Sequence, residues 1–461
     1  MSHLLIRPGD ALRGEARLPG DKSISHRALI LGAIAAGTTP VHDFLPAGDC
    51  LATLRAVRAL GIEVERPTPS DVIVHGRGLH GLEEPGNVLD CARSGTTLRL
   101  LAGLLAGQPF SSVLSGDEQL RRRPMGRIAA PLRLMGATVL GRDGGRRPPL
   151  AIQGGGLRGI DYELPVASAQ VKSALLLAGL FAEGDTTLHV PGPARDHTER
   201  LLRAMGCDVW YQVAGSRYAV PGTRYPIPDA SSPISNTQYL KLHPPRQLHP
   251  LDLTIPGDFS SAAFLIVAAL LVPDSQVTLR GVGVNPTRTG LLDVLAAMGA
   301  GVELREPRDE DGEPVADLTV RSAELTAVEV GGEVVVRAID ELPLLAVAAS
   351  QARGQTVLRD AGELRVKETD RIAVTVAELR RLGAEIEGRP DGFAVQGPTP
   401  LQGAAVDSHG DHRLAMALCV AGLLARGETR REDTRVEGAD CIADSFPGFA
   451  QTLAGLGADV Q

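Results

Sequence analysis

The sequence predicts an α/β protein of two similar domains, each built from three repeated helix/strand units. Six stretches read as a small polar entrance followed by an apolar helix, and a helix with no polar face must be buried all round. After each of them comes a second helix that ends at a glycine and passes into a strand. The apolar helices begin near Ser25, Ser94, Ser168, Phe259, Asp340 and Asp411, and the helix-ending glycines are Gly61, Gly136, Gly206, Gly299, Gly383 and Gly457.

The repeats group in threes because PGDKS from Pro19 opens the first and PGDFS from Pro256 opens the fourth. Each repeat is expected to be a helix, strand, helix, strand unit. Two alternating segments at the N-terminus, residues 4–7 and 14–18, are expected to form a hairpin. Residues 221–250 hold seven prolines and are interpreted as an inserted surface loop, and the charged residues 306–314 as a second loop.

Composition is that of a water-soluble globular protein, with 43% apolar and 22% charged residues in a chain of 461. The net charge of −8 argues against general nucleic-acid binding. The longest apolar run, residues 262–272, is too short to span a bilayer, and no N-terminal signal is recognised, so we expect a cytoplasmic protein or the mature form of an imported one. Five cysteines without paired spacing are expected to be reduced and mostly buried.

Basic residues stand at the mouths of the apolar helices, where an unpaired buried charge is expensive. They are Lys22, Arg27, Arg123, Lys367, Arg371 and Arg413. If the six helix entrances face one another, these cations would meet in one anion-binding cleft, because helix N-termini also attract anions. The alternative is internal pairing, for instance of Lys367 and Arg371 with Glu363, Glu368 or Asp370.

Eight motifs in order resemble the 5-enolpyruvylshikimate-3-phosphate synthase family, over essentially the whole chain apart from residues 221–250. They are PGDKSISHR from Pro19, SGTTLR from Ser94, RRPMGR from Arg122, SAQVKSALLLAG from Ser168, RDHTER from Arg195, DELP from Asp340, RVKETDR from Arg365 and DHRLAM from Asp411.

The resemblance implies the enolpyruvyl transferase fold, two inside-out α/β domains of three repeats each. The first domain would cover residues 21–250, and the second residues 1–20 plus 251–461. The implied reaction condenses phosphoenolpyruvate with the 5-hydroxyl of shikimate 3-phosphate, in the shikimate pathway to chorismate and the aromatic amino acids. No metal or organic cofactor is implied, the partners are the two small-molecule substrates without nucleic acid or membrane, and we expect a monomer.

The resemblance also assigns roles to individual residues. Shikimate 3-phosphate would be bound by Lys22, Ser23, Arg27, Ser168, Ala169, Gln170, Arg195, Asp340 and Lys367. Phosphoenolpyruvate would be bound by Lys22, Gly95, Arg123, Gln170, Arg371, His412 and Arg413. Asp340 is the expected base for the attacking hydroxyl, and Glu368 the expected acid for the methylene carbon, with Lys22 as its competitor. Ser23, Ser168 and Asp340 have a plainer alternative as helix caps.

Three positions depart from the family pattern. Arg93 stands where members often have asparagine, Ala169 where some use a second phosphate-binding serine, and Asp444 where some place a lysine against phosphoenolpyruvate. At Gly95, family members with alanine resist glyphosate, a longer molecule that occupies the phosphoenolpyruvate pocket. Since this chain has glycine there, it is expected to be glyphosate-sensitive.

Two other functions remain open at this stage. One is enolpyruvyl transfer to a UDP-linked amino sugar on the same fold, whose enzymes usually carry a reactive cysteine where this chain has Glu118. The other is a non-catalytic anion-binding protein. The joint presence of Lys22, Asp340 and Glu368 favours a working enzyme.

Overall fold

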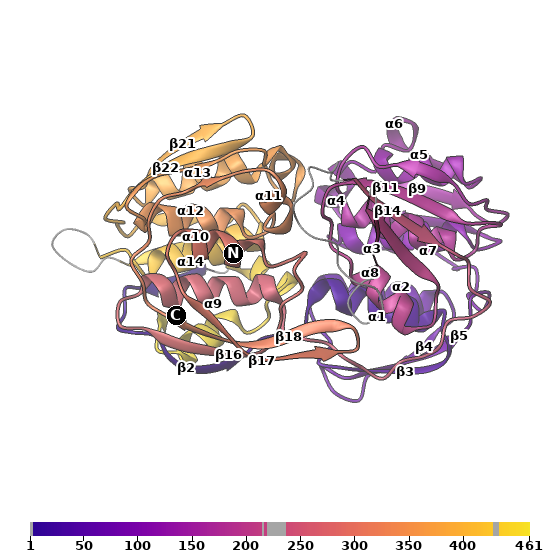
Figure 1. The fold of residues 1–461 in the computed structure, drawn as a ribbon, viewed down its shortest axis with the longest axis horizontal. Coiled ribbons are helices and arrows are strands. Elements are labelled where there is room, and N and C mark those ends of the chain that lie inside the picture. The colour runs from indigo at the N-terminus through magenta and orange to yellow at the C-terminus, as the bar shows by residue number, and fades with distance from the viewer. Residues whose placement is uncertain (1–2, 214–215, 219–236, 427–432) are drawn as a thin grey trace. The chain divides into compact units, whose positions relative to one another are not determined.

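The computed structural model describes residues 3–213, 216–218, 237–426 and 433–461. The chain divides into two compact units (Figure 1). Unit 1 comprises Met1–Asp21, Pro256–Asp309 and Pro314–Gln461, and unit 2 comprises Lys22–Ile255 and Glu310–Glu313.

Unit 2 contains the first three repeats. Its helices are α1 (Lys22–Ala33), α2 (Gly48–Ala59), α3 (Gly95–Ala106), α4 (Glu118–Arg122), α5 (Gly126–Leu134), α6 (Arg142–Gly145), α7 (Ala169–Gly179) and α8 (His197–Ala204). Its strands are β3 (Ala36–His42), β4 (Glu63–Glu65), β5 (Val72–Arg77), β6 (Leu89–Asp90), β7 (Ser111–Ser115), β8 (Thr138–Gly141), β9 (Arg147–Gln153), β10 (Asp161–Glu163), β11 (Thr186–Pro191), β12 (Val209–Val213), β13 (Ser216–Tyr218), β14 (Thr237–Leu242) and β15 (Leu253–Thr254).

Unit 1 contains the last three repeats and the N-terminal strands. Its helices are α9 (Phe259–Leu271), α10 (Gly290–Ala297), α11 (Glu333–Arg337), α12 (Leu342–Gln351), α13 (Arg371–Arg381), α14 (His412–Gly422) and α15 (Phe449–Gly455), with 3₁₀ turns η1 (Gly362–Val366) and η2 (Ala439–Asp444). Its strands are β1 (His3–Arg7), β2 (Arg13–Arg17), β16 (Gln276–Gly283), β17 (Val302–Glu310), β18 (Glu313–Arg321), β19 (Glu329–Val330), β20 (Gly354–Leu358), β21 (Glu385–Arg389), β22 (Gly392–Gly397), β23 (Ala405–Asp407), β24 (Thr434–Glu437) and β25 (Asp459–Val460).

Each repeat builds one sheet, and the described residues form six of them. In the order β6-β7-β9-β8, for example, β6 runs parallel to β7, and β9 runs antiparallel to both β7 and β8. The repeat is therefore larger than the predicted helix, strand, helix, strand unit. It has an additional first strand, and a return strand that lies between the two predicted ones.

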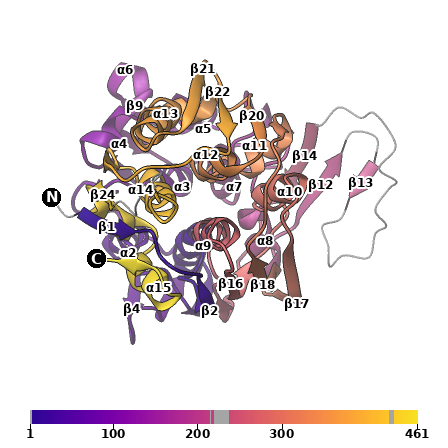
Figure 2. The same ribbon diagram turned by 90° about the vertical axis from the view of Figure 1, so that its left-hand side faces the viewer.

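The apolar helices lie inside each unit, as predicted. Every residue of α14 is buried, and in unit 1 the helices α9, α12 and α14 pack against one another with strands around them (Figure 2). In unit 2, α3 packs against both α1 and α7. The six helix-ending glycines all have positive φ, from 84° to 113°, a conformation that glycine adopts at little cost.

The predicted N-terminal hairpin is wrong. β1 pairs with β24 and β25, whereas β2 pairs in parallel with β16, so the two strands belong to different sheets of unit 1. β1 supplies the return strand of the sixth repeat, and β2 supplies the first strand of the fourth. The alternation of side chains identified the strands, but it does not say which partner a strand finds.

The predicted loop at residues 221–250 is wrong for residues 237–242. Thr237–Leu242 forms β14, which pairs with both β11 and β12 and is the return strand of the third repeat. Leu240 and Leu242 are fully buried. The neighbouring prolines masked a short alternating strand, and the additional chain is inserted between β12 and β14. Residues 219–236 lie outside the described residues.

The predicted charged loop at residues 306–314 is a hairpin of β17 and β18. β17 is the edge strand of its sheet, and charged side chains are common on exposed edges. The hairpin tip, residues 310–313, belongs to unit 2, where Arg200 Nη1 donates to the carbonyl of Gly312 at 2.7 Å. The structure thus groups residues 251–255 and 310–313 with unit 2, whereas the predicted boundaries put them in the second domain.

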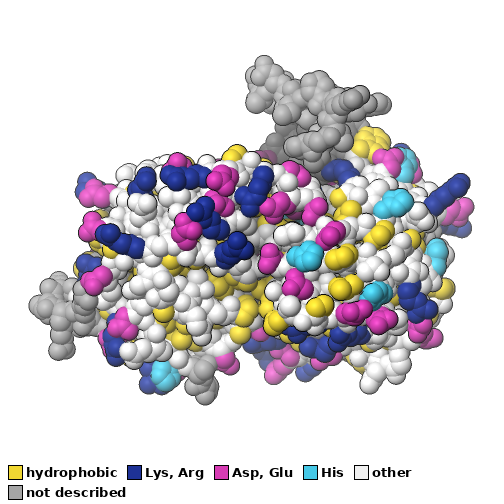
Figure 3. Space-filling view, turned by 90° about the horizontal axis from the view of Figure 1, so that it is seen from below, with side chains coloured by type: hydrophobic (Ala, Val, Ile, Leu, Met, Phe, Trp, Pro, Cys, Tyr) yellow, Lys and Arg dark blue, Asp and Glu magenta, His cyan; other side chains and the backbone are white. Residues whose placement is uncertain are grey.

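Among the described residues, no helix is long and apolar enough to cross a bilayer. On the face drawn in Figure 3, Lys and Arg side chains are interspersed with Asp and Glu side chains. This mixed surface fits the modest net charge of −8.

Candidate active site

The entrance of α1 carries Lys22 and Arg27. Lys22 Nζ lies 2.5 Å from Oδ2 of Asp49, the second residue of α2. Both side chains keep some exposure, 16% and 12%, so the ammonium of Lys22 can still reach a ligand. This acidic partner was not anticipated from the sequence.

Arg27 is buried, and its guanidinium is held by neutral oxygens in three hydrogen bonds. Nε donates to Thr198 Oγ1 at 2.7 Å, Nη2 to Ser173 Oγ at 2.8 Å and Nη1 to the carbonyl of Ser23 at 2.9 Å. These bonds fix the orientation of the guanidinium. The capping alternative fails for Ser23, which lies inside α1 rather than before it.

Gly95 is the first residue of α3 and lies against two guanidinium groups. A Cβ at Gly95 would stand 2.8 Å from Nη1 of Arg123 and 2.9 Å from Nη1 of Arg99. Ser94 caps the helix, with its Oγ accepting from the Thr97 amide at 3.0 Å. A Cβ here would therefore have to displace the ends of two flexible side chains. The helix N-terminus and two cations converge on one place, which is suited to an anion.

Arg99 was missed by the sequence analysis. Its Nη1 donates to Gln170 Oε1 and its Nη2 to the carbonyl of Pro124 at 3.3 Å, and Gln170 Nε2 in turn donates to Thr96 Oγ1 at 2.9 Å. Arg99 therefore orients Gln170 and links α3 to α7. The available signal was its position as the one charged residue of the helix GTTLRLLAGLLA.

The entrance of α7 is formed by Ser168, Ala169 and Gln170. Ser168 is the N-cap, and its Oγ accepts from the Val171 amide at 3.5 Å, so the capping alternative holds for this serine. Arg195 lies between β11 and α8 and is partly exposed. A partly exposed arginine ahead of a helix is accessible to a ligand phosphate.

In unit 1, three carboxylates surround the buried guanidinium of Arg371. Nε donates to Asp411 Oδ2 at 2.8 Å, Nη2 to Glu368 Oε2 at 2.7 Å and Nη1 to Asp340 Oδ1 at 3.2 Å. Burial acts to lower the pKa of Arg371, but Asp411, Glu368 and Asp340 outweigh it and raise this pKa above its usual value. Internal pairing is therefore found at Arg371, and Glu368 is one of the partners that the sequence analysis named.

Asp340 precedes α12 in a turn, and it does not cap that helix. The N-cap is Glu341, whose side chain makes no capping hydrogen bond. Besides Arg371, Asp340 has Lys367 nearby, with Nζ 3.6 Å from its Oδ1. The sequence placed no cation beside Asp340 except Arg337, whereas the fold supplies two from the segment around α13.

His412 and Arg413 are the first residues of α14 and are 7% and 5% exposed. Asp411 caps the helix, with Oδ1 accepting from the Arg413 amide at 2.9 Å. Nη1 of Arg413 is buried and has no hydrogen-bond partner among the described residues. A buried cationic N–H without an acceptor is costly, so this position calls for an anion.

Of the departures from the family pattern, Arg93 has a local explanation. It forms an ion pair with Asp117 at 3.4 Å, and both side chains are 39% exposed. The pair links the turn before α3 to the N-cap of α4. Asp444 is the last residue of η2 and is partly buried.

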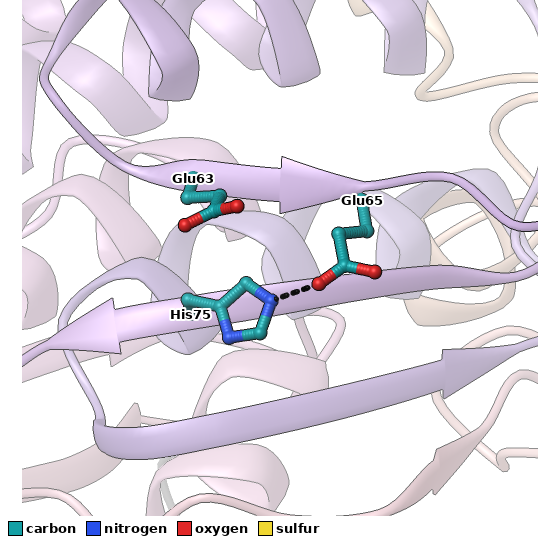
Figure 4. Close-up of side chains that lie close together, drawn as sticks. All are labelled: Glu63, Glu65 and His75. Carbon is teal, nitrogen blue, oxygen red and sulfur yellow. Dashed lines mark hydrogen bonds and ion pairs between the residues drawn. The ribbon is translucent and has the colours of Figure 1, made fainter.

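One group of described residues has the spacing of metal ligands, although the sequence showed no such cluster. Glu63 and Glu65 on β4 and His75 on β5 bring one ligand atom each within 4.8 Å of one another (Figure 4). The His75 Nε2 to Glu65 Oε1 hydrogen bond of 2.7 Å accounts for part of this arrangement. Both glutamates are exposed, and a surface ion pair explains the group equally well.

The cysteines agree with expectation, since all five are free and buried. Burial raises the pKa of Cys207 to about 12, with a further increase from Asp208 and a partial decrease from Arg203. Burial likewise raises the pKa of Cys91 and Cys419 above the usual range. These thiols are structural rather than reactive.

Comparisons with known proteins identify the family of the chain. The chain matches the EPSP synthase (3-phosphoshikimate 1-carboxyvinyltransferase) family over residues 6–232 and 227–453. It is 52% identical over 456 residues to a 3-phosphoshikimate 1-carboxyvinyltransferase from Geobacter sp. (strain M21), with 99% of each chain covered. It is 50% identical over 450 residues to the enzyme of that name from Desulforamulus reducens, with 98% of each chain covered.

Solved structures confirm the predicted enolpyruvyl transferase fold. EPSP synthase from Acinetobacter baumannii has a TM-score of 0.83 at 41% identity and covers 100% of this chain and 99% of its own. The enolpyruvyl transferase NikO from Streptomyces tendae, at 20% identity, has a TM-score of 0.76 over 100% of this chain and 98% of its own, a likeness of fold alone. Together with the match over nearly the whole sequence, these findings show that the chain belongs to the EPSP synthase family.

Proposed function

We propose that the groups around Arg371 and around Gly95 carry out the reaction of this family. Its enzymes transfer the enolpyruvyl group of phosphoenolpyruvate to the 5-hydroxyl of shikimate 3-phosphate and release phosphate, and by its family the chain is an enzyme of this kind. What we add is the assignment of the chemistry to individual residues.

The observation that carries the proposal is that Asp340 and Glu368 both bind the guanidinium of Arg371, through Nη1 at 3.2 Å and Nη2 at 2.7 Å. A planar guanidinium can hold two carboxylates in fixed places, which is what a paired base and acid require. The network that holds Arg371 also fixes these two groups.

In the first step Asp340 takes the proton of the 5-hydroxyl group while the hydroxyl oxygen bonds to C2 of phosphoenolpyruvate. Glu368 donates a proton to C3, which becomes a methyl group. The product is a tetrahedral intermediate. In the second step the C–O bond to phosphate breaks, and the methyl group returns a proton to a carboxylate as the double bond reforms. Lys22, whose ammonium pairs with Asp49, is the second candidate for the acid.

Shikimate 3-phosphate is assigned to hydroxyl, amide and cationic groups at the entrances of α1 and α7 and beside Asp340. They are Lys22, Ser23, Arg27, Ser168, Ala169, Gln170, Arg195, Asp340 and Lys367. Arg27 is consistent with this assignment because three hydrogen bonds, to Thr198, Ser173 and the carbonyl of Ser23, hold its guanidinium in a fixed orientation at the entrance of α1.

Phosphoenolpyruvate is assigned to arginines at helix entrances, because its carboxylate and phosphate both suit planar donors. The residues are Lys22, Gly95, Arg123, Gln170, Arg371, His412 and Arg413, to which we add Arg99. The lack of a described acceptor for Arg413 Nη1 and the convergence of Arg99 and Arg123 on Gly95 support this assignment.

A phosphate-release assay tests the proposal. The wild type should turn over shikimate 3-phosphate with phosphoenolpyruvate, and it should release no phosphate when a UDP-linked amino sugar replaces shikimate 3-phosphate. Asp340→Asn and Glu368→Gln should each lower kcat by about 10²- to 10⁴-fold. Glu387→Gln, an exposed residue on β21, is the matched control and should leave kcat unchanged.

The roles of base and acid fail if Asp340→Asn or Glu368→Gln keeps kcat within about twofold of the wild type. If Lys22→Met lowers kcat and Glu368→Gln does not, Lys22 is the acid.

We also propose that the enzyme works as a monomer in the cytoplasm. Its five buried free cysteines are consistent with a reducing compartment. Sedimentation at micromolar concentration should give a single species of about 48 kDa, as expected for the chain mass of 48.4 kDa; a species of twice that mass would contradict a monomer.

A further inference from the structure

A fully buried ion pair joins two helices of unit 2 close to the proposed substrate residues. Nζ of Lys172 on α7 lies 2.6 Å from Oε1 of Glu199 on α8, and both side chains are 0% exposed. Neither residue is among those assigned above to a substrate. Both lie in the first turn of their helices, which begin at Ala169 and His197.

Stability alone is a weak explanation for this pair. Removing a lysine and a glutamate from water costs more than their attraction generally returns, and apolar residues of similar volume often serve as well or better. The pair is therefore expected to have a role in placing something.

Lys172 holds the backbone segment that precedes α8. Besides its bond to Glu199, Nζ donates to the backbone carbonyl of Ala194 at 3.1 Å. Ala194 immediately precedes Arg195, which we assign to shikimate 3-phosphate. One ammonium therefore ties three points together: the first turn of α7, the first turn of α8 and the loop that carries Arg195.

Hydroxyl groups extend this connection to α1. Ser173, next to Lys172, and Thr198, next to Glu199, are hydrogen bonded to each other at 2.7 Å. Both also accept from Arg27, at 2.8 Å and 2.7 Å. Ser173 and Thr198, each one residue away from a member of the ion pair, thus connect α7 and α8 to Arg27 on α1.

We propose that Lys172 and Glu199 are positioning residues that hold Arg195 in place for the phosphate of shikimate 3-phosphate. The inference rests on the proposed role of Arg195. Losing the ammonium releases the Ala194 carbonyl and so loosens the backbone that carries Arg195. The cost should therefore fall on shikimate 3-phosphate binding and spare phosphoenolpyruvate.

The test replaces both partners, because removing one alone leaves a buried charge uncompensated and is strongly destabilising. The double variant Lys172→Met with Glu199→Leu approximately keeps the side-chain volume but lacks both charges and the donor to Ala194. It should fold, with a Tm within a few degrees of the wild type. The KM for shikimate 3-phosphate should rise about tenfold or more, and the KM for phosphoenolpyruvate should stay within about twofold.

The matched control is the partly exposed pair of Lys241 and Asp185, whose Nζ and Oδ2 also lie 2.6 Å apart within unit 2. The double variant Lys241→Gln with Asp185→Asn should change neither the KM for shikimate 3-phosphate nor the KM for phosphoenolpyruvate. If both constants of the Lys172 and Glu199 variant shift equally, or if the KM for shikimate 3-phosphate stays within twofold of the wild type, the inference is overturned.

A double-mutant cycle with Arg195→Ala separates this inference from the proposed function. If the pair acts through Arg195, its replacement should raise the KM for shikimate 3-phosphate in the wild-type background and have little further effect without Arg195. Equal increases in both backgrounds would show that the pair acts elsewhere and overturn the inference, leaving the assignment of Arg195 intact. If Arg195→Ala itself leaves this KM unchanged, the assignment of Arg195 fails, and the inference fails with it.

Discussion

Arg371 and Asp411 face each other across two helix entrances, with Nε of the guanidinium 2.8 Å from Oδ2 of the carboxylate and their side chains 2% and 0% exposed. Arg371 begins α13, and Asp411 caps α14. Because a second oxygen of Asp411 accepts from the Arg413 amide, this pair fixes the start of the helix that carries Arg413.

Arg371→Ala should reduce stability as well as activity. It leaves Asp411 buried without its cation, and breaking such a pair typically costs about 3–5 kcal/mol. Urea unfolding should show this loss in the free energy of unfolding. The control is Arg353→Ala, whose pair with Glu324 is mostly exposed and should cost less than about 1 kcal/mol. Equal losses for the two variants would contradict the buried-pair argument.

Arg413→Ala should reduce activity without reducing stability. Its Nη1 is buried without an acceptor among the described residues, so removing the guanidinium should leave stability unchanged or raise it. If Arg413 binds phosphoenolpyruvate, kcat/KM for this substrate should fall by roughly 30- to 5,000-fold, equivalent to about 2–5 kcal/mol. A fall in Tm with kinetics within twofold of the wild type would make Arg413 a structural residue.

Arg123→Ala should also act mainly on phosphoenolpyruvate, with a loss of the same order. Arg123 packs against Gly95 beside Arg99, so the variant removes one of two cations from this helix entrance. The measurement is the KM for each substrate. Arg122→Ala, which removes a neighbouring exposed arginine paired with Glu118, is the control and should change neither constant.

Gly95→Ala should weaken glyphosate inhibition more than substrate binding. The wild type is expected to be inhibited competitively with phosphoenolpyruvate, and the variant should raise the inhibition constant well over tenfold, more than about 1.4 kcal/mol. The new methyl group would stand 2.8 Å from Arg123 Nη1. Since that is the end of a flexible side chain, it can move aside, at the cost of a smaller rise in the KM for phosphoenolpyruvate. A wild type that is insensitive to millimolar glyphosate would contradict this prediction.

Alkaline pH should reveal the burial of Cys207. The pKa of this thiol is raised to about 12 in the folded protein, whereas in the unfolded chain it is about 8.5. The contribution of the buried thiol to the free energy of unfolding is therefore complete below the pKa of the unfolded chain. It is lost as pH rises toward the pKa of the folded protein, because only the unfolded chain then releases the proton. Between about pH 9 and 11 the wild type should lose about 1.4 kcal/mol per pH unit relative to Cys207→Ala. Parallel curves for the two proteins would show that the thiol is not buried.

The repeats and their buried helices could be predicted because each is encoded locally. An apolar run between polar ends predicts a buried helix whatever lies elsewhere in the chain, and α14 is buried at every position. A glycine at the end of a helix likewise predicts a left-handed turn, and Gly457 has φ 104°. The residues that pair within one motif, such as Glu368 with Arg371, also came from the sequence.

The tertiary structure alone decided which distant segments meet. β1 and β2 were recognised as strands, but they join two different sheets, because pairing depends on the packing of whole repeats. In β14, prolines nearby hid an alternation that becomes meaningful only once Leu240 and Leu242 face a core. The sequence analysis did not single out Arg99 or Lys172, because the partners of each side chain lie outside its own helix or in a loop.

The sequence by itself therefore determined the fold class, the family and the motifs that bear the chemistry. Only the tertiary structure decided which groups surround each buried charge. Arg371 is hydrogen bonded to Asp411, 40 positions away, and Arg27 to Thr198, 171 positions away. The physical reason is that the free energy of a buried charge depends on its nearest neighbours in space, and residues separated by tens of positions become neighbours only when the helices that carry them pack together.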